Sequence, residues 1–409
     1  MRTLKIVAAL LVVAGLFGGD HPRYISDYYN APAPRVEISK DEQQVADRVN
    51  DALRSRGLTI LSMDPRMVLV CRHISAYLQA NGIERVDVFD SDEIKRQLND
   101  AGVTDGRIMI HLGNSHGVDE FIGSSLDKLV EQVRNAGMTH VGVGVVSGGM
   151  LSRVSFITLI MTKRPVLLGT LPRKVAGGTR QSLSIAPARG VKNVGLHFSD
   201  PAGRELPVEL RGAAGGKRFA ELNFNAGGGA YTIEVTFEGD YGPEVGALFQ
   251  VQCQGPAAAQ SQASVSPYTE IDWDIRNEQE AEDLILMLIN DERISAGLTP
   301  LTLYGPLSDV ARGHSRDMAQ NNFVGHLSPG RGDVSDRVDA AGIKWSRVTE
   351  NIARAETIQD AHRGLMGSPV HRRNVIDSEV NFVGIGVVFI DGPYGGRQVL
   401  VTVDFLAMR

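Results

Sequence analysis

Cysteine is scarce in this chain of 409 residues, because only Cys71 and Cys253 are present. Cys71 continues an apolar helical pattern, and Cys253 ends an alternating strand pattern, so both side chains should point inward in different parts of the chain. We therefore expect two separate buried thiols and no disulfide between them. The count also excludes a disulfide-dense scaffold.

An excess of positive charge is also missing. Asp and Glu number 48 against 42 Lys and Arg, which gives a formal net charge of -6. Such a balance provides no basic surface for a nucleic acid. We expect no nucleic-acid partner.

No long apolar run is present either. A basic start precedes an apolar stretch at 6–17, which is shorter than the ~20 residues of a membrane span. This pattern predicts a signal peptide at 1–19 and export to the periplasm or the exterior. The cleavage site is poor, because Leu16 and Phe17 stand where small residues are preferred. An uncleaved N-terminal anchor is the alternative and the only membrane contact that we expect.

Motifs for nucleophilic and nucleotide chemistry are lacking. No serine sits in a G-x-S-x-G frame, so a serine hydrolase is not predicted. The glycine-rich stretch at 142–149 has Ser147 where a dinucleotide-binding loop needs its third glycine. β-Branched residues follow at 154–160 in place of a helix. We predict two adjacent strands there.

What the sequence does contain is three polar frames between residues 325 and 374. His326 precedes Ser-Pro in a predicted loop, Glu350 opens Glu-Asn-Ile-Ala, and His371 follows Ser368-Pro369. Serine is a preferred N-cap and proline suits the first helical position, so His371 falls in a first turn that keeps its ring neutral. Two imidazoles and a carboxylate can hold a divalent metal such as zinc, or steer a water.

These frames resemble the CAP superfamily of cysteine-rich secretory, antigen 5 and pathogenesis-related proteins, in its bacterial SCP-like branch. The resemblance covers residues 278–409 and implies an α-β-α sandwich with an antiparallel sheet between helices. The family's fuller metal set has two histidines and two glutamates, and here its second glutamate position falls on Ser368. The remaining family elements are Asn290, Arg293, Gly297, Leu298, Pro300, Leu301, the segment 311–318, Phe323 and Val383-Gly384-Ile385-Gly386-Val387.

An internal repeat links the two ends of the chain. Asn50-Asp51 and Asn290-Asp291 lie 240 residues apart, and matches continue at that spacing through Ser75 and Ser315. We therefore predict a degenerate CAP-like α-β-α domain at 40–164, which lacks the three polar frames. Its own His111 and His116 match no family element, and we interpret them as core or loop histidines.

Between the two predicted units the pattern becomes all-β. Short strands with glycine-rich turns predict an immunoglobulin-like β-sandwich at 165–255, with linkers at 20–39 and 256–277. In one strand Tyr231, Ile233, Val235 and Phe237 alternate with Thr232, Glu234, Thr236 and Glu238. Such alternation predicts one face in the core and one face in water.

The overall expectation is an α/β multi-domain protein with two competing functions. The favoured function is an exported, non-catalytic binding module for a small ligand, a lipid or a cell-envelope component, with a divalent metal, zinc, as a candidate cofactor. The alternative is a metal-dependent, peptidase-like hydrolase. The same three residues are the candidate metal ligands and catalytic residues: His326, Glu350 and His371.

Overall fold

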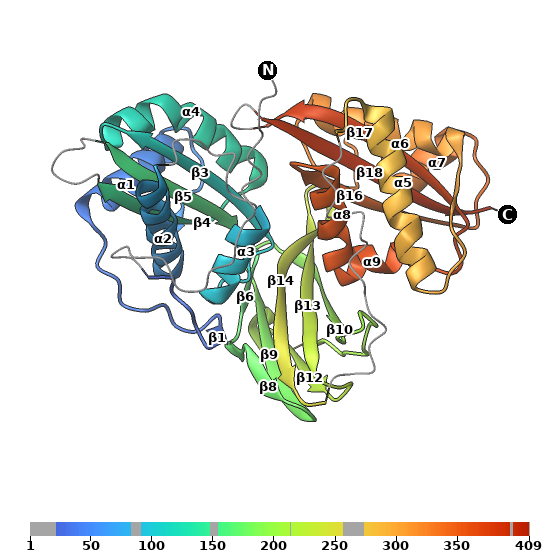
Figure 1. Ribbon diagram of the computed structural model, residues 1–409, viewed down its shortest axis with the longest axis horizontal. Coiled ribbons are helices and arrows are strands. Elements are labelled where there is room, and N and C mark those ends of the chain that lie inside the picture. Colours follow the sequence, from blue (N-terminus) through green and yellow to red (C-terminus); the bar gives the residue numbers. More distant parts are fainter. Residues whose placement is uncertain are drawn as a thin grey trace, which may run out of the picture.

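The computed structural model describes residues 22–82, 91–147, 154–212, 214–256, 274–392 and 396–408. Two α/β units flank a β-sandwich, as Figure 1 shows. The predicted signal at 1–19 and residues 257–273 of the second predicted linker lie outside the described residues. Within the described ranges, every helix is too short or too polar to cross a membrane.

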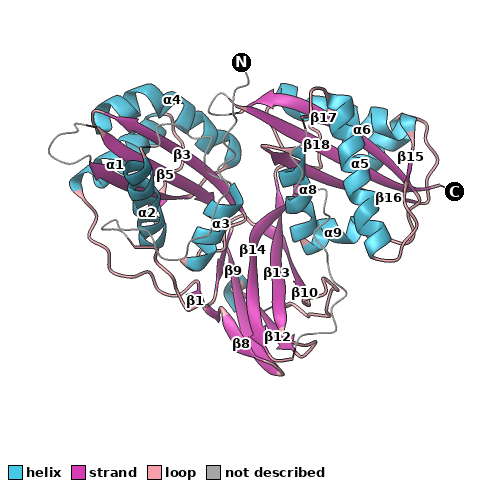
Figure 2. Cartoon of the chain, in the orientation of Figure 1, coloured by secondary structure: helices cyan, strands magenta, loops and turns pink. Residues whose placement is uncertain are grey.

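The C-terminal unit is a four-stranded sheet between two layers of helices (Figure 2). The strand order is β15-β17-β18-β16. The last two strands, β17 and β18, pair antiparallel, as the resemblance implies. The elements are α5 (Glu278–Ser295), β15 (Thr302–Leu303), α6 (Gly305–Asn321), α7 (Val334–Ala340), β16 (Arg347–Ala355), α8 (Ile358–Gly367), α9 (Pro369–Val375), β17 (Phe382–Asp391) and β18 (Arg397–Ala407).

The prediction of a wholly antiparallel sheet is wrong at one edge, where β15 runs parallel to β17. The chain enters β15 from α5 and returns to β17 only after four more helices and β16. Such a long crossover is the connection that parallel pairing requires.

Alternate residues of β17 point toward opposite helix layers. Val383, Ile385 and Val387 pack into the core formed with α5 and α8. Gly384 and Gly386 face α6, where a Cβ at Gly384 would lie 2.4 Å from the backbone carbonyl carbon of Leu307. The two glycines therefore let the α6 backbone lie directly against the sheet.

The N-terminal unit has the same topology. Its sheet order is β2-β4-β5-β3, with β2 and β4 parallel and the other two pairs antiparallel. The adjacent strands predicted around the glycine-rich stretch are confirmed as β4 and β5. The elements are α1 (Lys40–Ser55), β2 (Ser62–Met63), α2 (Pro65–Asn81), α3 (Ser91–Asp100), β3 (Arg107–Ser115), α4 (Val118–Ala136), β4 (His140–Ser147) and β5 (Ser155–Lys163).

The agreement between the two units extends to individual hydrogen bonds. The side chain of Asn50 exchanges two hydrogen bonds with the backbone of Leu61, at 2.8 and 3.0 Å. Asn290 makes the same pair with Leu301, at 2.7 and 3.2 Å. A Cβ at Gly142 would meet the α2 backbone at 2.5 Å, as one at Gly384 would meet α6. Both units therefore use one scaffold.

The middle unit contains two four-stranded sheets, in the orders β10-β13-β14-β8 and β11-β12-β9-β6, and both contribute to one apolar core. Cys253 is buried here and Cys71 is buried in the N-terminal unit, which confirms two separate free thiols. The strands are β6 (Val166–Leu168), β8 (Lys174–Ala176), β9 (Thr179–Pro187), β10 (Lys192–Ser199), β11 (Arg211–Gly212), β12 (Arg218–Phe224), β13 (Gly229–Gly239) and β14 (Gly242–Gln254), with a 3-10 helix at Ala214–Gly216.

The predicted linker at 20–39 is wrong in its centre. There β1 (Tyr28–Tyr29) pairs with β7 (Leu171–Pro172), and Tyr29 is buried in the core of the sandwich. The Tyr29 ring packs on Phe249 with centroids 4.6 Å apart, and its hydroxyl donates to the carbonyl of Gln250. The segment is polar in composition, but Tyr29 anchors it to the core of the sandwich.

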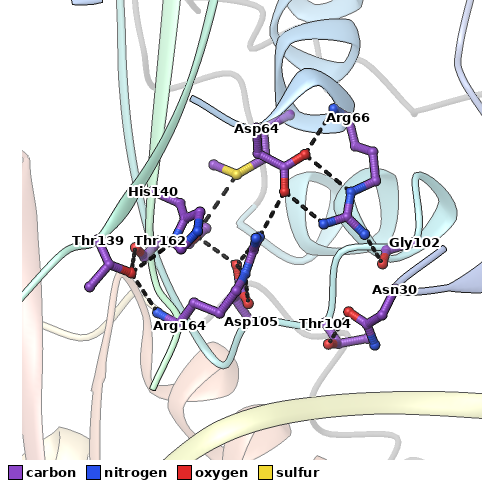
Figure 3. Close-up of polar contacts among 11 residues, drawn as sticks. Asn30, Asp64, Arg66, Gly102, Thr104, Asp105, Thr139, His140, Thr162 and Arg164 are labelled. Carbon is purple, nitrogen blue, oxygen red and sulfur yellow. Dashed lines mark hydrogen bonds and ion pairs between the residues drawn. The ribbon is translucent and has the colours of Figure 1, made fainter. Parts of the chain in front are cut away.

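A buried ion network, drawn in Figure 3, lies where the N-terminal unit meets the sandwich. Arg164 bonds both Asp64 and Asp105, and Arg66 bonds Asp64 at 2.7 Å. Asp105 also pairs through its backbone with Ala247 of β14. Two carboxylates and two guanidinium groups satisfy one another here, which is how buried charges are tolerated.

Candidate functional site

The centre of the site is a carboxylate held between a histidine and an arginine. Glu350 points from β16 toward the α6 side of the sheet and is 6% exposed. Its Oε1 accepts a hydrogen bond from Nδ1 of His326 at 2.9 Å, and its Oε2 is bonded by the guanidinium of Arg337. Burial alone would raise the pKa of Glu350, but the His326 bond and the Arg337 charge outweigh it and hold that pKa below its usual value.

This contact fixes the tautomer of His326. A carboxylate only accepts hydrogen bonds, so Nδ1 of His326 carries the proton and Nε2 is left as the acceptor or ligating nitrogen. Arg337 also donates to the carbonyl oxygen of His326 at 3.0 Å, which fixes the backbone of the same loop. The side chain of His326 is 25% exposed, so a molecule in solution can reach it.

Arg337 comes from α7, a short helix whose start is fixed by a capping box. Asp333 caps the helix and Asp336 completes the box, so Arg331-Gly332-Asp333 is a helix start. Arg337 was not predicted as a site residue. In the sequence it is marked only as a charged residue next to Val338, which is buried in a short helix.

Two more buried groups complete the cluster. Nε2 of His314 bonds the carbonyl oxygen of Gly325 at 2.9 Å and also lies 3.9 Å from Oε2 of Glu350. Asp404 of β18 pairs in register with Glu350. Neither oxygen of Asp404 meets a hydrogen-bond donor among the described residues.

Asp404 is a carboxyl group buried beside a second carboxyl group, Glu350. Burial raises the pKa of Asp404 well above its ordinary value, and the adjacent Glu350 adds to the rise, although Arg337 opposes it. The signal in the sequence was an acidic residue inside the apolar run 399–406, which the sequence interpretation passed over.

The third predicted residue, His371, lies on α9 as expected. Ser368 caps α9 with its hydroxyl accepting from the His371 N–H, and Pro369 follows at the first helical position. Burial, and then the nearby His326, lower the pKa of His371 to about 4. This low pKa keeps the ring neutral at pH 7, as predicted.

Asparagine side chains tie α9 to the strand that carries Glu350. Asn351 donates to the carbonyl of His371 at 2.9 Å, and Asn374 donates to Oδ1 of Asn351 at 2.8 Å and to the carbonyl of Glu350 at 3.3 Å. These bonds place the His371 helix beside Glu350.

The N-terminal unit shows what this scaffold looks like without the cluster. The sheet registers place Ile110 and Ile160 at the positions of Glu350 and Asp404, and the helix repeat places Ile74 at that of His314. Ile74 and Ile160 are fully buried, and Ile110 packs against the same core. The fold therefore does not require polar groups at these positions.

The predicted metal set fits only in part. Both oxygens of Glu350 are engaged, so this residue matches a carboxylate that orients His326 better than it matches a third ligand. Within the described ranges, no group of three or more His, Cys, Asp or Glu side chains is arranged to hold a metal ion. His326 and His371 keep the donor chemistry that zinc prefers.

Comparison with known proteins gives this unit a family. Residues 286–405 match the model of the cysteine-rich secretory protein family, CAP. These residues form a CAP domain. It contains the five residues of the cluster and the nearby His371: His314, His326, Arg337, Glu350, Asp404 and His371.

Two Bacillus subtilis proteins are similar to the CAP domain. The uncharacterized protein YkwD and the uncharacterized membrane protein YlbC are each 34% identical over 108 residues, or 26% of this chain. The match spans only 42% of YkwD and 31% of YlbC.

Solved structures of bacterial SCP proteins are also similar. An extracellular protein containing an SCP domain from Bacillus anthracis is 30% identical, with a TM-score of 0.28, over 32% of this chain and 41% of that one. A cysteine-rich secretory protein from Staphylococcus aureus is 12% identical, with a TM-score of 0.27, over 55% of this chain and 77% of that one.

Proposed function

We propose that the protein is an exported binding module whose CAP domain captures a small ligand, a lipid or a cell-envelope component at His326 and His371. The observation that carries this proposal is the contrast between the two units. One scaffold holds buried isoleucines in the N-terminal unit and a histidine–carboxylate–arginine cluster in the CAP domain. Buried ionic groups are costly, so their presence at one of two equivalent places indicates a function there.

The chemistry of the site suits recognition of a polar group. Nε2 of His326 can accept a hydrogen bond, because Glu350 holds the proton on Nδ1. His371 is neutral and partly buried, so it can give or accept a hydrogen bond without a charge. The N-terminal unit, with an apolar counterpart of this cluster, is a degenerate copy that serves as a scaffold.

A metal-dependent hydrolase is the second candidate. The Glu350–His326 contact favours it, because a carboxylate on Nδ1 makes the other ring nitrogen a better base or a better metal ligand. In that case His326 and His371 would hold a zinc ion, which would supply a Lewis acid, and Glu350 would hold the His326 ring in place.

The decisive experiment follows the NMR signals of His326 and His371 while defined probes are added. Full-length protein with 13C-labelled histidine is titrated with Zn²⁺, with muropeptides from digested peptidoglycan, and with vesicles of phosphatidylglycerol and phosphatidylethanolamine. Signals are assigned with His326→Gln and His371→Gln, and His116→Gln is the matched control because this N-terminal histidine is 72% exposed.

Each outcome bears on one candidate. Saturable shifts of the His326 or His371 signals with muropeptides or vesicles, lost in the two site variants and kept in His116→Gln, support the binding module. Zinc-dependent cleavage of an unstructured protein such as casein, abolished by His326→Gln, would replace that proposal with the hydrolase. If no probe shifts either signal, the proposed role of the two histidines is refuted.

A further inference from the structure

The β-hairpin formed by β13 and β14 contacts both segments that carry the site histidines. At its turn, Tyr241 accepts a hydrogen bond from the backbone N–H of Leu327 at 2.8 Å, next to His326. Its ring packs on Phe323 with centroids 4.8 Å apart. A Cβ at Gly242 would lie 3.2 Å from the Cβ of His326, so the hairpin turn lies directly against the His326 loop.

Farther along the same hairpin, Glu234 holds the helix that carries His371. Its Oε1 accepts a hydrogen bond from the hydroxyl of Ser368 at 2.7 Å, and its Oε2 accepts one from the N–H of Val370 at 3.0 Å. Ser368 in turn caps the N–H of His371. Glu234 therefore bonds the two residues that begin the first turn of α9 on either side of Pro369.

Glu234 overturns part of the strand prediction. The alternation of β13 predicts that Glu234 faces water, and its neighbour Glu238 is indeed exposed, whereas Glu234 is 0% exposed. The reason is that α9 of the CAP domain covers this face of the sandwich, as Figure 1 shows for α9 beside β10 and β13. A carboxylate is expensive to bury, so it remains here only because hydrogen bonds satisfy it.

Other bonds extend the same contact along β10 and the following turn. Arg373 bonds Glu205 at 2.9 Å and Nδ1 of His197 at 3.0 Å, and Arg372 donates to the carbonyl of Gly203 at 3.2 Å. The CAP domain thus meets the sandwich with the side that bears its site. The N-terminal unit meets the same hairpin with a different corner, the ion network of Figure 3 beside β14.

We propose that Glu234 and Tyr241 are positioning residues of the site, supplied by the sandwich, and that this hairpin sets the relative placement of His326 and His371. The functional unit is accordingly the CAP domain together with the sandwich. The inference rests on the proposed function for what the histidines do, whereas its test reads the histidine rings directly and needs no ligand.

The test compares the pKa of His371 in full-length variants by NMR titration of 13C-labelled histidine. The pKa of His371 is low because of burial and His326. A rise of that pKa after substitution of Glu234 therefore indicates that the His371 ring has become more exposed or has moved away from His326. We expect Glu234→Ala to raise the His371 pKa by about one unit or more toward the ordinary value of about 6.5. Glu234→Gln keeps one acceptor and should give a smaller rise.

The matched control is Glu238→Ala, which removes the same side chain from the exposed end of the same strand and should leave the His371 pKa unchanged. A lower melting temperature with an unchanged His371 pKa would make Glu234 a tie between domains only, and would overturn the proposal. If Glu234→Ala does not fold, Glu234→Gln decides alone, and an unchanged His371 pKa in it overturns the proposal equally. Failure of every probe to bind would refute the proposed function but not this inference.

Discussion

Replacing Asp404 by asparagine should stabilise the CAP domain at neutral pH and remove part of its pH dependence. Asp404 is fully buried beside Glu350, and burial raises its pKa well above the value that it has in the unfolded chain. Above about pH 4 the native protein therefore binds this proton more tightly than the unfolded chain does. The stability that this proton provides is fully present at low pH and is lost as the pH rises through the native pKa.

The size of the effect follows from the linkage. The free energy of unfolding falls by about 1.4 kcal/mol for each pH unit over which only the native state holds the proton. Between about pH 4 and pH 7 this loss of stability is therefore about 4 kcal/mol at most. Asparagine has the same shape, does not titrate, and can donate from its amide to Glu350. After imperfect packing is allowed for, we expect Asp404→Asn to gain about 1–3 kcal/mol at pH 7. The gain should disappear near pH 4.

Urea unfolding at pH 4.5 and pH 7 measures the unfolding free energy of Asp404→Asn and of the parent protein at each pH. Trp345 lies in the CAP domain, and in a Trp273→Phe background it is the only tryptophan, so its fluorescence reports that domain. Asp391→Asn, which removes an exposed carboxylate of β17, is the matched control and should change neither value appreciably. If Asp404→Asn and the parent show the same change in unfolding free energy between the two pH values, Asp404 holds no extra proton and the reasoning is wrong.

Two further predictions use the same fluorescence assay. His371 has a native pKa of about 4. Between about pH 6.5 and pH 4 the unfolded chain therefore binds a proton at this histidine and the native protein does not, so the free energy of unfolding falls as the pH falls. This cost should be about 1–3 kcal/mol, discounted for the partial exposure of the ring, and His371→Gln should abolish it; an unchanged pH profile would contradict the assignment. Gly384→Ala should cost about 1–3 kcal/mol or more, because its Cβ would overlap the α6 backbone. Gly364→Ala, in open space on α8, should be neutral or stabilising by up to about 1 kcal/mol, and equal effects at both glycines would refute the close-approach argument.

The sequence by itself determined the local features whose cause is local. Capping chemistry explains two helix starts, the one at Ser368-Pro369 and the capping box of α7. Side-chain periodicity explains the two buried thiols and the pairing of β17 with β18. The CAP domain was recognisable for the same reason, because its polar frames are short and contiguous. The repeat at a spacing of 240 residues also led to Asn50 and Asn290, whose equivalent hydrogen bonds the structure shows.

Only the tertiary structure decided what surrounds each site residue. No sequence pattern pairs Glu350 with Arg337 or Asp404, because those contacts depend on strand register and on how α7 packs against β16. The burial of Glu234 and of Tyr29 could not be predicted for the same reason. Alternation correctly placed Glu234 on the outer face of its strand, but a different domain covers that face. Tyr29 is buried by strands more than 140 residues away in the chain. Periodicity reports the environment that a segment makes for itself, whereas burial by a distant segment is fixed only when the whole chain has folded.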